Sequence, residues 1–445
     1  MRILLIGNGA REHIIAEVIH KSHHKPELVV IGKSKNPGIL KLATEYIIGN
    51  IEDLDFIRSK AQLLKPDYAI IGPDNQIGIG CADILEDLSI PTFAPKKTVA
   101  RLESSKGFTR ALVSKYKIPG NPDFIIITKE NFADAKSFAE KYDGEFVVKY
   151  DGLFGGKGVQ VAGEHFNSIA EGLVFAQECL ETSPQVVLEQ KLIGPEFSLM
   201  FFADGKNLVR MPAVQDHKRA YEGDKGPNTG GMGTYSDANH SLPFLSEQDL
   251  VDAEEITRQT MIALKQETNT DFRGIMYGGF MKTKHGVKLI EYNARFGDPE
   301  AMNVLSILES DFVDMMLASF DQKLGEYPVK FSNSATVCIY VVPKGYPDNP
   351  IASEEDKIIV IKKESSAAKL FFASVDLIEE TETEFKLKMS SSRSIALVGT
   401  GNTIENALTN AKDGLKLISG NIHYRNDIGT TELIQKRIDL VNSFS

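Results

Sequence analysis

The segment EYNARFGDPE, residues 291–300, carries the residue types best suited to chemistry on a charged substrate. It overlaps a strand predicted over residues 287–293, so side-chain alternation puts Glu291, Asn293 and Arg295 on one face. A carboxylate and a carboxamide oxygen suit Mg²⁺ or Mn²⁺. An arginine beside them can hold a carboxylate or an acyl phosphate through paired hydrogen bonds. The segment therefore predicts a metal site next to an anion site; a surface salt-bridge cluster is the alternative.

A second candidate is the glycine-rich segment DGLFGGKG, residues 151–158, between two predicted strands. It is not a Walker A loop, because Asp151 and Gly158 occupy the first-glycine and Ser/Thr positions. A glycine-rich hairpin that closes over nucleotide phosphates is the device that kinases use. Lys106 and Lys149 could then act as point charges on phosphate oxygens. A plain flexible turn is the alternative.

The N-terminal segment IGNGAREH, residues 6–13, links the first predicted strand to the first helix. Glu12 replaces the third glycine of a dinucleotide fingerprint, and no acid ends the second strand, which disfavours a nicotinamide or flavin site. The helix N-terminus after Gly9 can instead present backbone N–H groups to a phosphorylated ligand. Arg11 would add a cation there, and Glu12 an acceptor for a hydroxyl or amine. A merely tight turn is the alternative.

Two further segments could surround a small anion. GPNTGGMG at residues 226–233 offers many backbone N–H groups. QDHKR at residues 215–219 offers an acid, an imidazole and two cations, although a charged solvated turn is equally consistent. His20, His23 and His24 lie near a helix end with no acid partner at ligand spacing. We therefore expect these histidines to be solvated rather than to bind a metal.

The composition is that of an ordinary globular chain. Of its 445 residues, 42% are hydrophobic and 25% charged, and the formal net charge is −11. The negative charge argues against a dedicated nucleic-acid partner, and no apolar run reaches the roughly 18 residues of a membrane span. Cys81, Cys179 and Cys338 form no CxxC pair, which predicts reduced core thiols. We expect a cytoplasmic monomer that acts on small molecules.

The elements that must position these residues change in kind along the chain. Up to about residue 95, short apolar strands alternate with helices, which predicts a doubly wound parallel sheet. From residue 104 to about residue 319, helices alternate with paired strands, including a hairpin of residues 275–282 and 287–293, which predicts α+β modules. A polar stretch, residues 322–334, then precedes a small closing α+β domain.

Together, IGNGAREH, the region of Lys106, DGLFGGKGV, QDHKR, GPNTGGMG and EYNARFGDPE resemble the phosphoribosylamine–glycine ligase family of the ATP-grasp superfamily. The resemblance covers nearly the whole chain. It implies an N-terminal Rossmann-like domain over residues 1–103, an ATP-grasp domain over 104–325 with a hinged lid at about 122–192, and a C-terminal domain over 326–445. It also implies ligation of glycine to 5-phosphoribosylamine through glycyl phosphate, with ATP and Mg²⁺ (or Mn²⁺). Another ATP-grasp carboxylate–amine ligase is the alternative.

The resemblance also implies roles for individual residues. Glu291 and Asn293 match the metal ligands, and Arg295 matches a catalytic residue that also holds glycine. The implied ATP contacts are Lys106, Lys149, Gly155, Gly156, Lys157, Glu189, Gln190, Lys191, Leu192 and Glu196. The implied substrate contacts, besides Arg295, are Gly9, Arg11, Glu12, Asp74, Asp216, Lys218, Asn228, Thr229, Gly230, Gly231 and Arg393.

Some positions depart from the family pattern. Phe154 and Gly155 stand where the lid usually has alanines, and Asp74 stands where a glutamate is usual. The segments at residues 34–39 and 391–392 also differ from the usual motifs. All of these changes except the lid change would line the phosphoribosylamine pocket.

Overall fold

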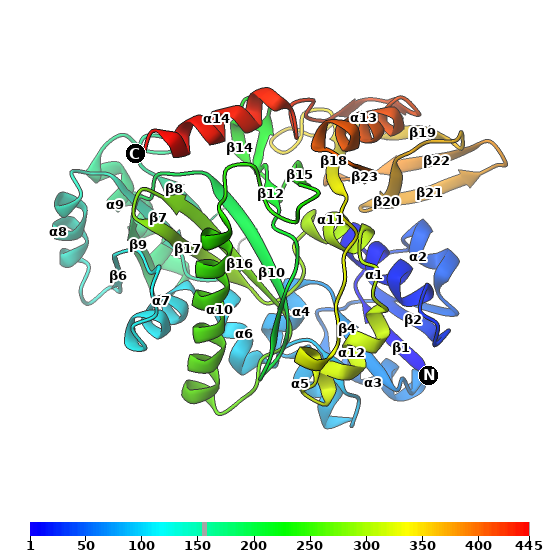
Figure 1. Ribbon diagram of the computed structural model, residues 1–445, viewed down its shortest axis with the longest axis horizontal. Coiled ribbons are helices and arrows are strands. Elements are labelled where there is room, and N and C mark those ends of the chain that lie inside the picture. The colour runs from blue at the N-terminus through cyan, green and yellow to red at the C-terminus, as the bar shows by residue number, and fades with distance from the viewer. Residues whose placement is uncertain (154–157, 445) are drawn as a thin grey trace.

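The computed structural model describes residues 1–153 and 158–444 (Figure 1). Within these two ranges, no helix is both long and apolar enough to cross a membrane. Cys81, Cys179 and Cys338 are buried free thiols, as the sequence predicts.

The N-terminal region is a parallel sheet with crossover helices, as predicted. Its elements are β1 (Arg2–Ile6), α1 (Ala10–His20), β2 (Glu27–Gly32), α2 (Pro37–Leu42), β3 (Glu45–Ile48), α3 (Leu54–Leu64), β4 (Tyr68–Ile71), α4 (Asp74–Ile79), α5 (Cys81–Asp87), β5 (Thr92–Phe93) and α6 (Lys97–Ser104). The strands lie in the order β3-β2-β1-β4-β5, and every pair is parallel. Residues 3–6 of β1 are fully buried, which explains why that strand is apolar throughout rather than alternating.

The middle of the chain forms an antiparallel sheet, the central sheet, in the order β11-β10-β16-β17. The elements of this part are α7 (Lys106–Lys115), β10 (Glu196–Asp204), β11 (Leu208–Arg210), α10 (Glu247–Thr268), β16 (Arg273–Thr283), β17 (Gly286–Asn293), α11 (Glu300–Ser306), α12 (Phe312–Phe320) and the 3₁₀ turn η1 (Leu324–Glu326). The predicted hairpin is confirmed as β16 and β17. Helix α10 begins where predicted, because Ser246 and Asp249 form a reciprocal capping box.

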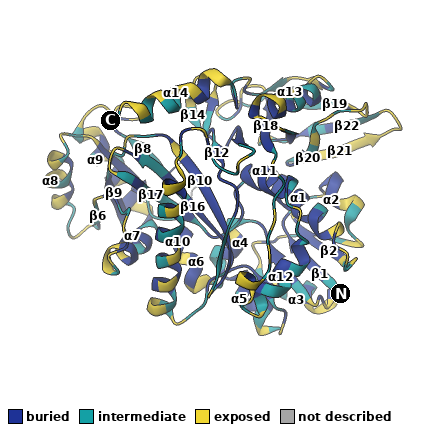
Figure 2. Ribbon diagram, in the orientation of Figure 1, coloured by how far each residue is buried: buried dark blue, intermediate teal, exposed yellow. Residues whose placement is uncertain are grey.

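A second antiparallel sheet, in the order β6-β9-β7-β8, belongs to the region of residues 122–192, here called the lid. Its elements are β6 (Phe124–Ile127), α8 (Ala133–Lys141), β7 (Phe146–Tyr150), β8 (Val159–Val161), α9 (Ile169–Thr182) and β9 (Val186–Gln190). Residues such as Phe146 and Leu188 form a hydrophobic core that is separate from the main core. Figure 2 shows β7 and β9 buried in the middle of this sheet, with exposed residues on α8. The lid is therefore a small body with its own packing.

The C-terminal sheet is completed by strands from the middle of the chain. Its order is β12-β15-β18-β23-β20, with β25 also paired to β18, and a separate sheet has the order β21-β22-β19-β24. The mid-chain elements are β12 (Gln215–Asp216), β13 (Arg219–Tyr221), β14 (Lys225–Asn228) and β15 (Gly233–Ser236). The later elements are β18 (Ala335–Pro343), β19 (Ile358–Lys362), β20 (Lys369–Phe372), β21 (Val375–Glu380), β22 (Glu384–Met389), β23 (Ile395–Gly401), α13 (Ile404–Leu415), β24 (Ile418–Gly420), β25 (Ile422–His423) and α14 (Thr431–Asn442). The two predicted anion segments thus lie against the C-terminal region, and α14 extends from that region toward the lid (Figure 1).

Candidate active site

A cavity of about 990 Å³ lies where the lid, the central sheet and both terminal regions meet. Residues from every candidate segment line it: Arg11, Asp74, Lys106, Lys149, Glu189, Gln190, Lys191, Leu192, Glu196, Asp216, Lys218, Asn228, Thr229, Gly230, Glu291, Asn293, Arg295 and Arg393. Gly9, Glu12 and Gly231 are not among the described residues of this lining. The predicted contacts Gly155, Gly156 and Lys157 lie outside the described residues. The fold thus brings most of the predicted site together.

At the lid end of the cavity, three buried charges form a triad. The Lys149 Nζ lies 2.8 Å from Glu189 Oε2 and donates to the carbonyl of Ile290 at 3.1 Å. Arg110 donates two parallel hydrogen bonds to Glu189, at 2.7 and 2.8 Å. Burial would raise the pKa of Glu189, but Arg110 and Lys149 hold it below its usual value. Burial lowers the pKa of Lys149 despite its contact with Glu189. The Glu189 carboxylate therefore fixes the position of Lys149.

The base of the glycine-rich hairpin is attached to the N-terminus of α7. Asp151 accepts hydrogen bonds from the Ser105 hydroxyl at 3.0 Å and from the Gly107 amide at 3.1 Å. The Lys106 Nζ donates to the carbonyl of Gly152 at 3.0 Å. Asp151, whose presence in the sequence argues against a Walker A loop, thus connects the base of the hairpin to the N-terminus of α7.

Next to this triad, the cavity is lined by an alternating row of charges: Glu196 on β10, Lys218 after β12 and Glu291 on β17. The Lys218 Nζ lies 3.3 Å from Glu196 and 3.9 Å from Glu291. Burial would raise the pKa of Glu291, but the charges of Lys218 and Lys106 hold it below its ordinary value. Glu291 is therefore ionised at neutral pH. Asn293, two residues along β17, lines the same cavity, as the strand alternation predicts.

Arg295 is held by an acid that the sequence argument did not include. Its Nη2 lies 3.1 Å from Glu103 Oε1 and donates to Asn293 at 3.3 Å. Its Nε is buried and, among the described residues, has no hydrogen-bond partner. Burial would raise the pKa of Asp74, but Arg295 and Arg11 lower it. The guanidinium is thus fixed on one side, and its Nε–H is a buried donor that no described residue satisfies.

The N-terminal loop reaches the cavity through Arg11. The Arg11 Nη1 donates to the carbonyl of Phe296 at 3.2 Å, and Arg295 donates to the same oxygen. Glu12 is almost fully buried and accepts from the Gly9 amide at 2.5 Å and from Arg11 at 2.7 Å. Glu12 also packs against the backbone of Gly72, where an added Cβ would lie only 2.0 Å from Glu12 Oε1. The structure therefore places Glu12 as a brace between two loops rather than on the cavity wall.

The loop of residues 226–233 is held in place by hydrogen bonds from Thr229 and from Arg393. The amide and hydroxyl of Thr229 both donate to the carbonyl of Lys218, at 2.7 and 2.9 Å. The Arg393 guanidinium donates to the carbonyls of Gly230, Gly231 and Asp298 at 2.7, 3.1 and 2.8 Å. Gly231 has a φ of +109°, and a Cβ there would lie 2.8 Å from Asp216. Arg393 thus fastens this loop to the segment that follows Arg295.

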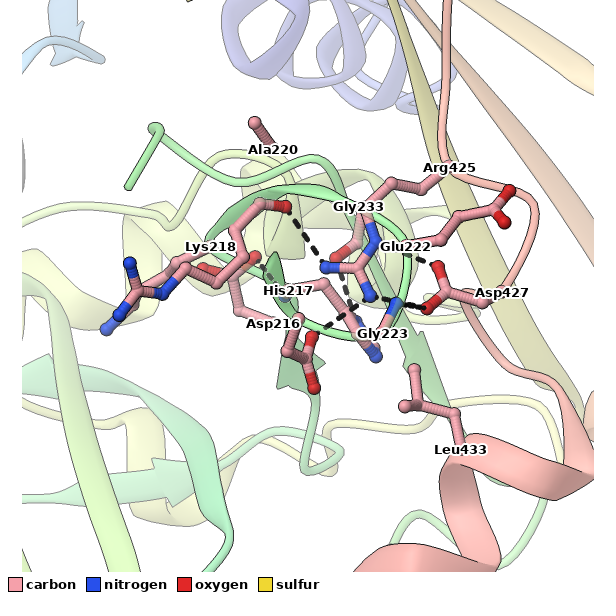
Figure 3. A network of polar contacts seen from close by, with 12 residues as sticks. Asp216, His217, Lys218, Ala220, Glu222, Gly223, Gly233, Arg425, Asp427 and Leu433 are labelled. Atoms are coloured by element: carbon pink, nitrogen blue, oxygen red, sulfur yellow. Dashed lines mark hydrogen bonds and ion pairs between the residues drawn. The ribbon is translucent and has the colours of Figure 1, made fainter. Parts of the chain in front are cut away.

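A polar network supports the loop from the side of the C-terminal region (Figure 3). The fully buried Arg425 is paired with Asp427 at 2.7 Å and with Asp224 at 3.0 Å, and it donates to the carbonyl of Arg219. Burial, reinforced by Arg425, lowers the pKa of His217 to about 4, so the imidazole is neutral. The C-terminal residues thereby set the position of the QDHKR segment.

Comparison with known proteins agrees with this geometry. The chain matches the phosphoribosylglycinamide synthetase N domain over residues 1–103, the ATP-grasp (A) domain over 104–301 and the C domain over 336–431. It is 45% identical to the phosphoribosylamine–glycine ligase of Methanosarcina barkeri, covering 99% of this chain and 98% of that protein. It is 44% identical to the enzyme of the same name from Methanocaldococcus jannaschii, with 99% of each covered. This chain belongs to the phosphoribosylamine–glycine ligase family.

Solved structures extend the comparison to three dimensions. The phosphoribosylamine–glycine ligase of Thermotoga maritima superposes with a TM-score of 0.79 at 27% identity, covering 96% of this chain and 100% of that one. The biotin carboxylase domain of the Hydrogenobacter thermophilus 2-oxoglutarate carboxylase has a TM-score of 0.69 at 16% identity, with 99% of this chain and 93% of that one covered. The second likeness shows the fold alone.

In this member of the phosphoribosylamine–glycine ligase family, three buried charges that are absent from the predicted site support its residues. Arg110 and Glu103 lie on α7 and α6, and each holds a predicted site residue. Glu300 accepts from the Tyr277 hydroxyl at 2.9 Å, and with burial it raises the pKa of Asp216 well above its usual value. The signal in the sequence that could have identified these residues is a charged residue at an otherwise apolar helix position. Such a residue suggests a buried ion pair, since buried charges are rare unless they are paired.

Proposed function

We propose that this chain joins glycine to 5-phosphoribosylamine, giving glycinamide ribonucleotide, ADP and phosphate. The observation that carries the proposal is 45% identity over 99% of the chain to a phosphoribosylamine–glycine ligase. A glycine carboxylate oxygen attacks the γ-phosphorus of ATP, ADP leaves, and glycyl phosphate forms. The amine nitrogen of 5-phosphoribosylamine then attacks the carbonyl carbon, phosphate leaves, and the nitrogen loses a proton.

Two oxygen donors in the cavity fit a divalent ion. The carboxylate of Glu291 is kept ionised by its neighbours, and Asn293 adds a carboxamide oxygen on the same strand face. Mg²⁺ and Mn²⁺ both prefer such ligands, and few protein groups are needed where phosphates supply the rest. The ion, when bound, would neutralise phosphate charge. We assign both residues as its ligands.

We place ATP at the lid end of the cavity. Lys149 is a buried cation fixed by Glu189, and Lys106 lies at the base of the hairpin. Both would offset negative charge as it shifts from the γ-phosphate to ADP. The other implied ATP contacts on this wall are Gln190, Lys191, Leu192 and Glu196.

We place glycine between Arg295 and the loop of residues 226–233. The Nε of Arg295 is a buried donor without a partner among the described residues, and a carboxylate is the ligand that would complete it. Asp216, beside the loop, faces Lys218 and Arg393 as well as Glu300. Arg295 and the loop would hold the glycine carboxylate in line with the γ-phosphorus.

We place the phosphate of 5-phosphoribosylamine at the N-terminus of α1. Arg11 reaches the cavity from this helix, and its guanidinium meets Arg295 at the carbonyl of Phe296. Backbone N–H groups after Gly9 would complete the anion site. Since an acyl phosphate hydrolyses readily, the lid would serve to exclude water while the amine attacks.

We propose domain limits at residues 1–103, 104–325 and 326–445.

The test is ADP release coupled to product formation. With ATP and Mg²⁺, transfer of ¹⁴C from glycine to a phosphorylated product should require 5-phosphoribosylamine, and the Glu291→Gln variant should be the inactive control. The rival is another ATP-grasp carboxylate–amine ligase, and the fold of this chain also resembles the biotin carboxylase domain above. ADP release that responds to bicarbonate or another carboxylate, and not to glycine, would favour the rival and refute the proposal.

A further inference from the structure

Two histidines and two aspartates from distant parts of the chain meet on the surface. His23 and His24 follow α1, and Asp311 and Asp314 stand at the start of α12. None of the four is among the described residues that line the large cavity. From the sequence alone we expect these histidines to be solvated, because no acid partner lies at ligand spacing along the chain. The fold corrects this, since Asp311 is 288 residues away from His23 and yet bonded to it.

Donor atoms of His23, His24 and Asp314 lie close enough together to bind one ion, and two of the histidine–aspartate pairs are already at hydrogen-bond distance. The His23 Nδ1 lies 2.9 Å from Asp311 Oδ2 and 3.9 Å from Asp314 Oδ2. The His24 Nε2 lies 2.6 Å from Asp314 Oδ1. One donor atom each from His23, His24 and Asp314 can be chosen so that all three lie within 4.8 Å of one another. Tetrahedral ligands about 2.0–2.1 Å from a zinc ion lie roughly 3.4 Å apart, which falls within this range.

The two carboxylates carry negative charge that lysine and arginine do not balance. Among the described residues, their partners at ion-pair distance are the two histidine rings. Without a proton on these rings, the cluster has a formal charge of −2. A divalent cation would neutralise that charge and replace the imidazole protons.

The cluster is also held in place by its surroundings. Asp311 caps α12 through the Val313 amide at 2.8 Å and accepts from the backbone amide of His23 at 2.9 Å. The Tyr327 hydroxyl donates to Asp314 at 3.4 Å. The side chain of Asp311 is 14% exposed and that of His23 is 66% exposed. The acids are thus partly shielded and braced, while the outer histidine leaves a path from solvent.

We propose that His23, His24 and Asp314 form a zinc site that joins the segment after α1 to α12, with Asp311 holding His23 in place. Two imidazole nitrogens with carboxylate oxygens are donors typical of Zn²⁺ and its neighbours Co²⁺ and Ni²⁺, whereas Mg²⁺ prefers oxygen alone. The site is distinct from the proposed catalytic ion at Glu291.

The experiment is a zinc titration of the full chain, free of any affinity tag and first treated with EDTA. Calorimetry is run with millimolar Mg²⁺ present, so that oxygen-only sites are filled. We expect one Zn²⁺ per chain, with affinity reduced about tenfold or more in His24→Gln and in Asp314→Asn. His20→Gln, an exposed histidine on α1 outside the cluster, is the matched control and should bind as the wild type does.

Co²⁺ offers a second readout that needs no variant. Binding should produce an intense visible absorption band of a tetrahedral ion, which Zn²⁺ abolishes. Ligase activity should be unchanged in His24→Gln and Asp314→Asn, which also reports that these variants are folded. Zinc binding that is equal in all variants, or the absence of both stoichiometric zinc uptake and the cobalt band in the wild type, would overturn the proposal and leave simple histidine–aspartate ion pairs.

Discussion

Replacing Glu189 with glutamine should destabilise the protein far more than a surface substitution of the same kind. Glu189 supplies the negative charge of the triad with Arg110 and Lys149, and all three residues are at most 5% exposed. With the carboxylate present, the triad has a formal charge of +1. In the variant, two buried cations share a neutral amide, and the charge becomes +2 without added solvent.

Removal of one partner from a buried ion pair typically destabilises a protein by about 3–5 kcal/mol. The glutamine oxygen can still accept one hydrogen bond, and Lys149 keeps its bond to the carbonyl of Ile290 at 3.1 Å. We therefore expect a loss of about 4 kcal/mol. Glu145→Gln is the matched control, because Glu145 pairs with Lys191 at 2.6 Å but its side chain is 61% exposed. An exposed pair of this kind contributes less than about 1 kcal/mol.

The assay is urea unfolding of the wild type and both variants, monitored by circular dichroism. The free energies of unfolding are compared provided that the three proteins have the same dependence on urea concentration (the m-value). Calorimetry would show whether the lid, which has its own core, unfolds in a separate transition. Because the folded pKa of Glu189 is depressed, its stabilising effect should be present above about pH 4.3 and should fade as the pH falls through the lower folded value. A loss below 1 kcal/mol in Glu189→Gln, equal to that of the control, would refute the picture of a water-excluded triad.

Four further predictions concern the other parts of the site. Glu291→Gln should lower kcat by about two orders of magnitude, on the order of 3 kcal/mol in the barrier, and near-normal turnover at saturating Mg²⁺ would contradict its role as a metal ligand. Arg295→Lys loses the guanidinium fork and should lower kcat/KM for glycine more than ATP affinity; a selective loss of ATP affinity would instead assign it to the nucleotide. Gly9→Val should raise KM for 5-phosphoribosylamine, as should Arg11→Ala more weakly, while calorimetry shows unchanged ATP affinity; the reverse pattern would place the nucleotide at this loop. Burial lowers the pKa of His13 to about 4. Because the unfolded chain then binds a proton that the folded chain does not, the free energy of unfolding should fall by up to about 3 kcal/mol as the pH drops from 6.5 to 4. A His13→Gln variant whose free energy of unfolding depends on pH as that of the wild type does would disprove this role of His13.

Local features of the fold could be predicted because they depend on neighbours in the chain. The alternation of apolar strands and helices predicted the N-terminal parallel sheet, and the spacing around residues 284–286 predicted the hairpin of β16 and β17. Ser246 and Asp249 predicted the start of α10, since a capping box involves only four consecutive residues. The pairing of β15 with β18 carries no such local signal, because the strands are about a hundred residues apart.

The candidate site divides in the same way. The period of β17 predicted that Glu291 and Asn293 share a face, and both line the cavity. By contrast, the sequence suggested a ligand-facing Glu12, whereas the structure buries it with both oxygens bonded to Gly9 and Arg11. A glutamate at a helix start can point to a ligand or cap the helix, and the packing of neighbouring loops decides between them.

The sequence by itself determined the residue types, their order and the local geometry that aligns them on a strand or at a helix end. It therefore indicated the kind of chemistry, since a carboxylate, a carboxamide and an arginine on one face have few alternatives. Tertiary structure alone decided which distant charges meet: Arg110 with Glu189, and Asp311 with His23. The physical reason is that burial and pairing of a charge depend on the packing of whole elements, whose contacts join residues 79 and 288 positions apart.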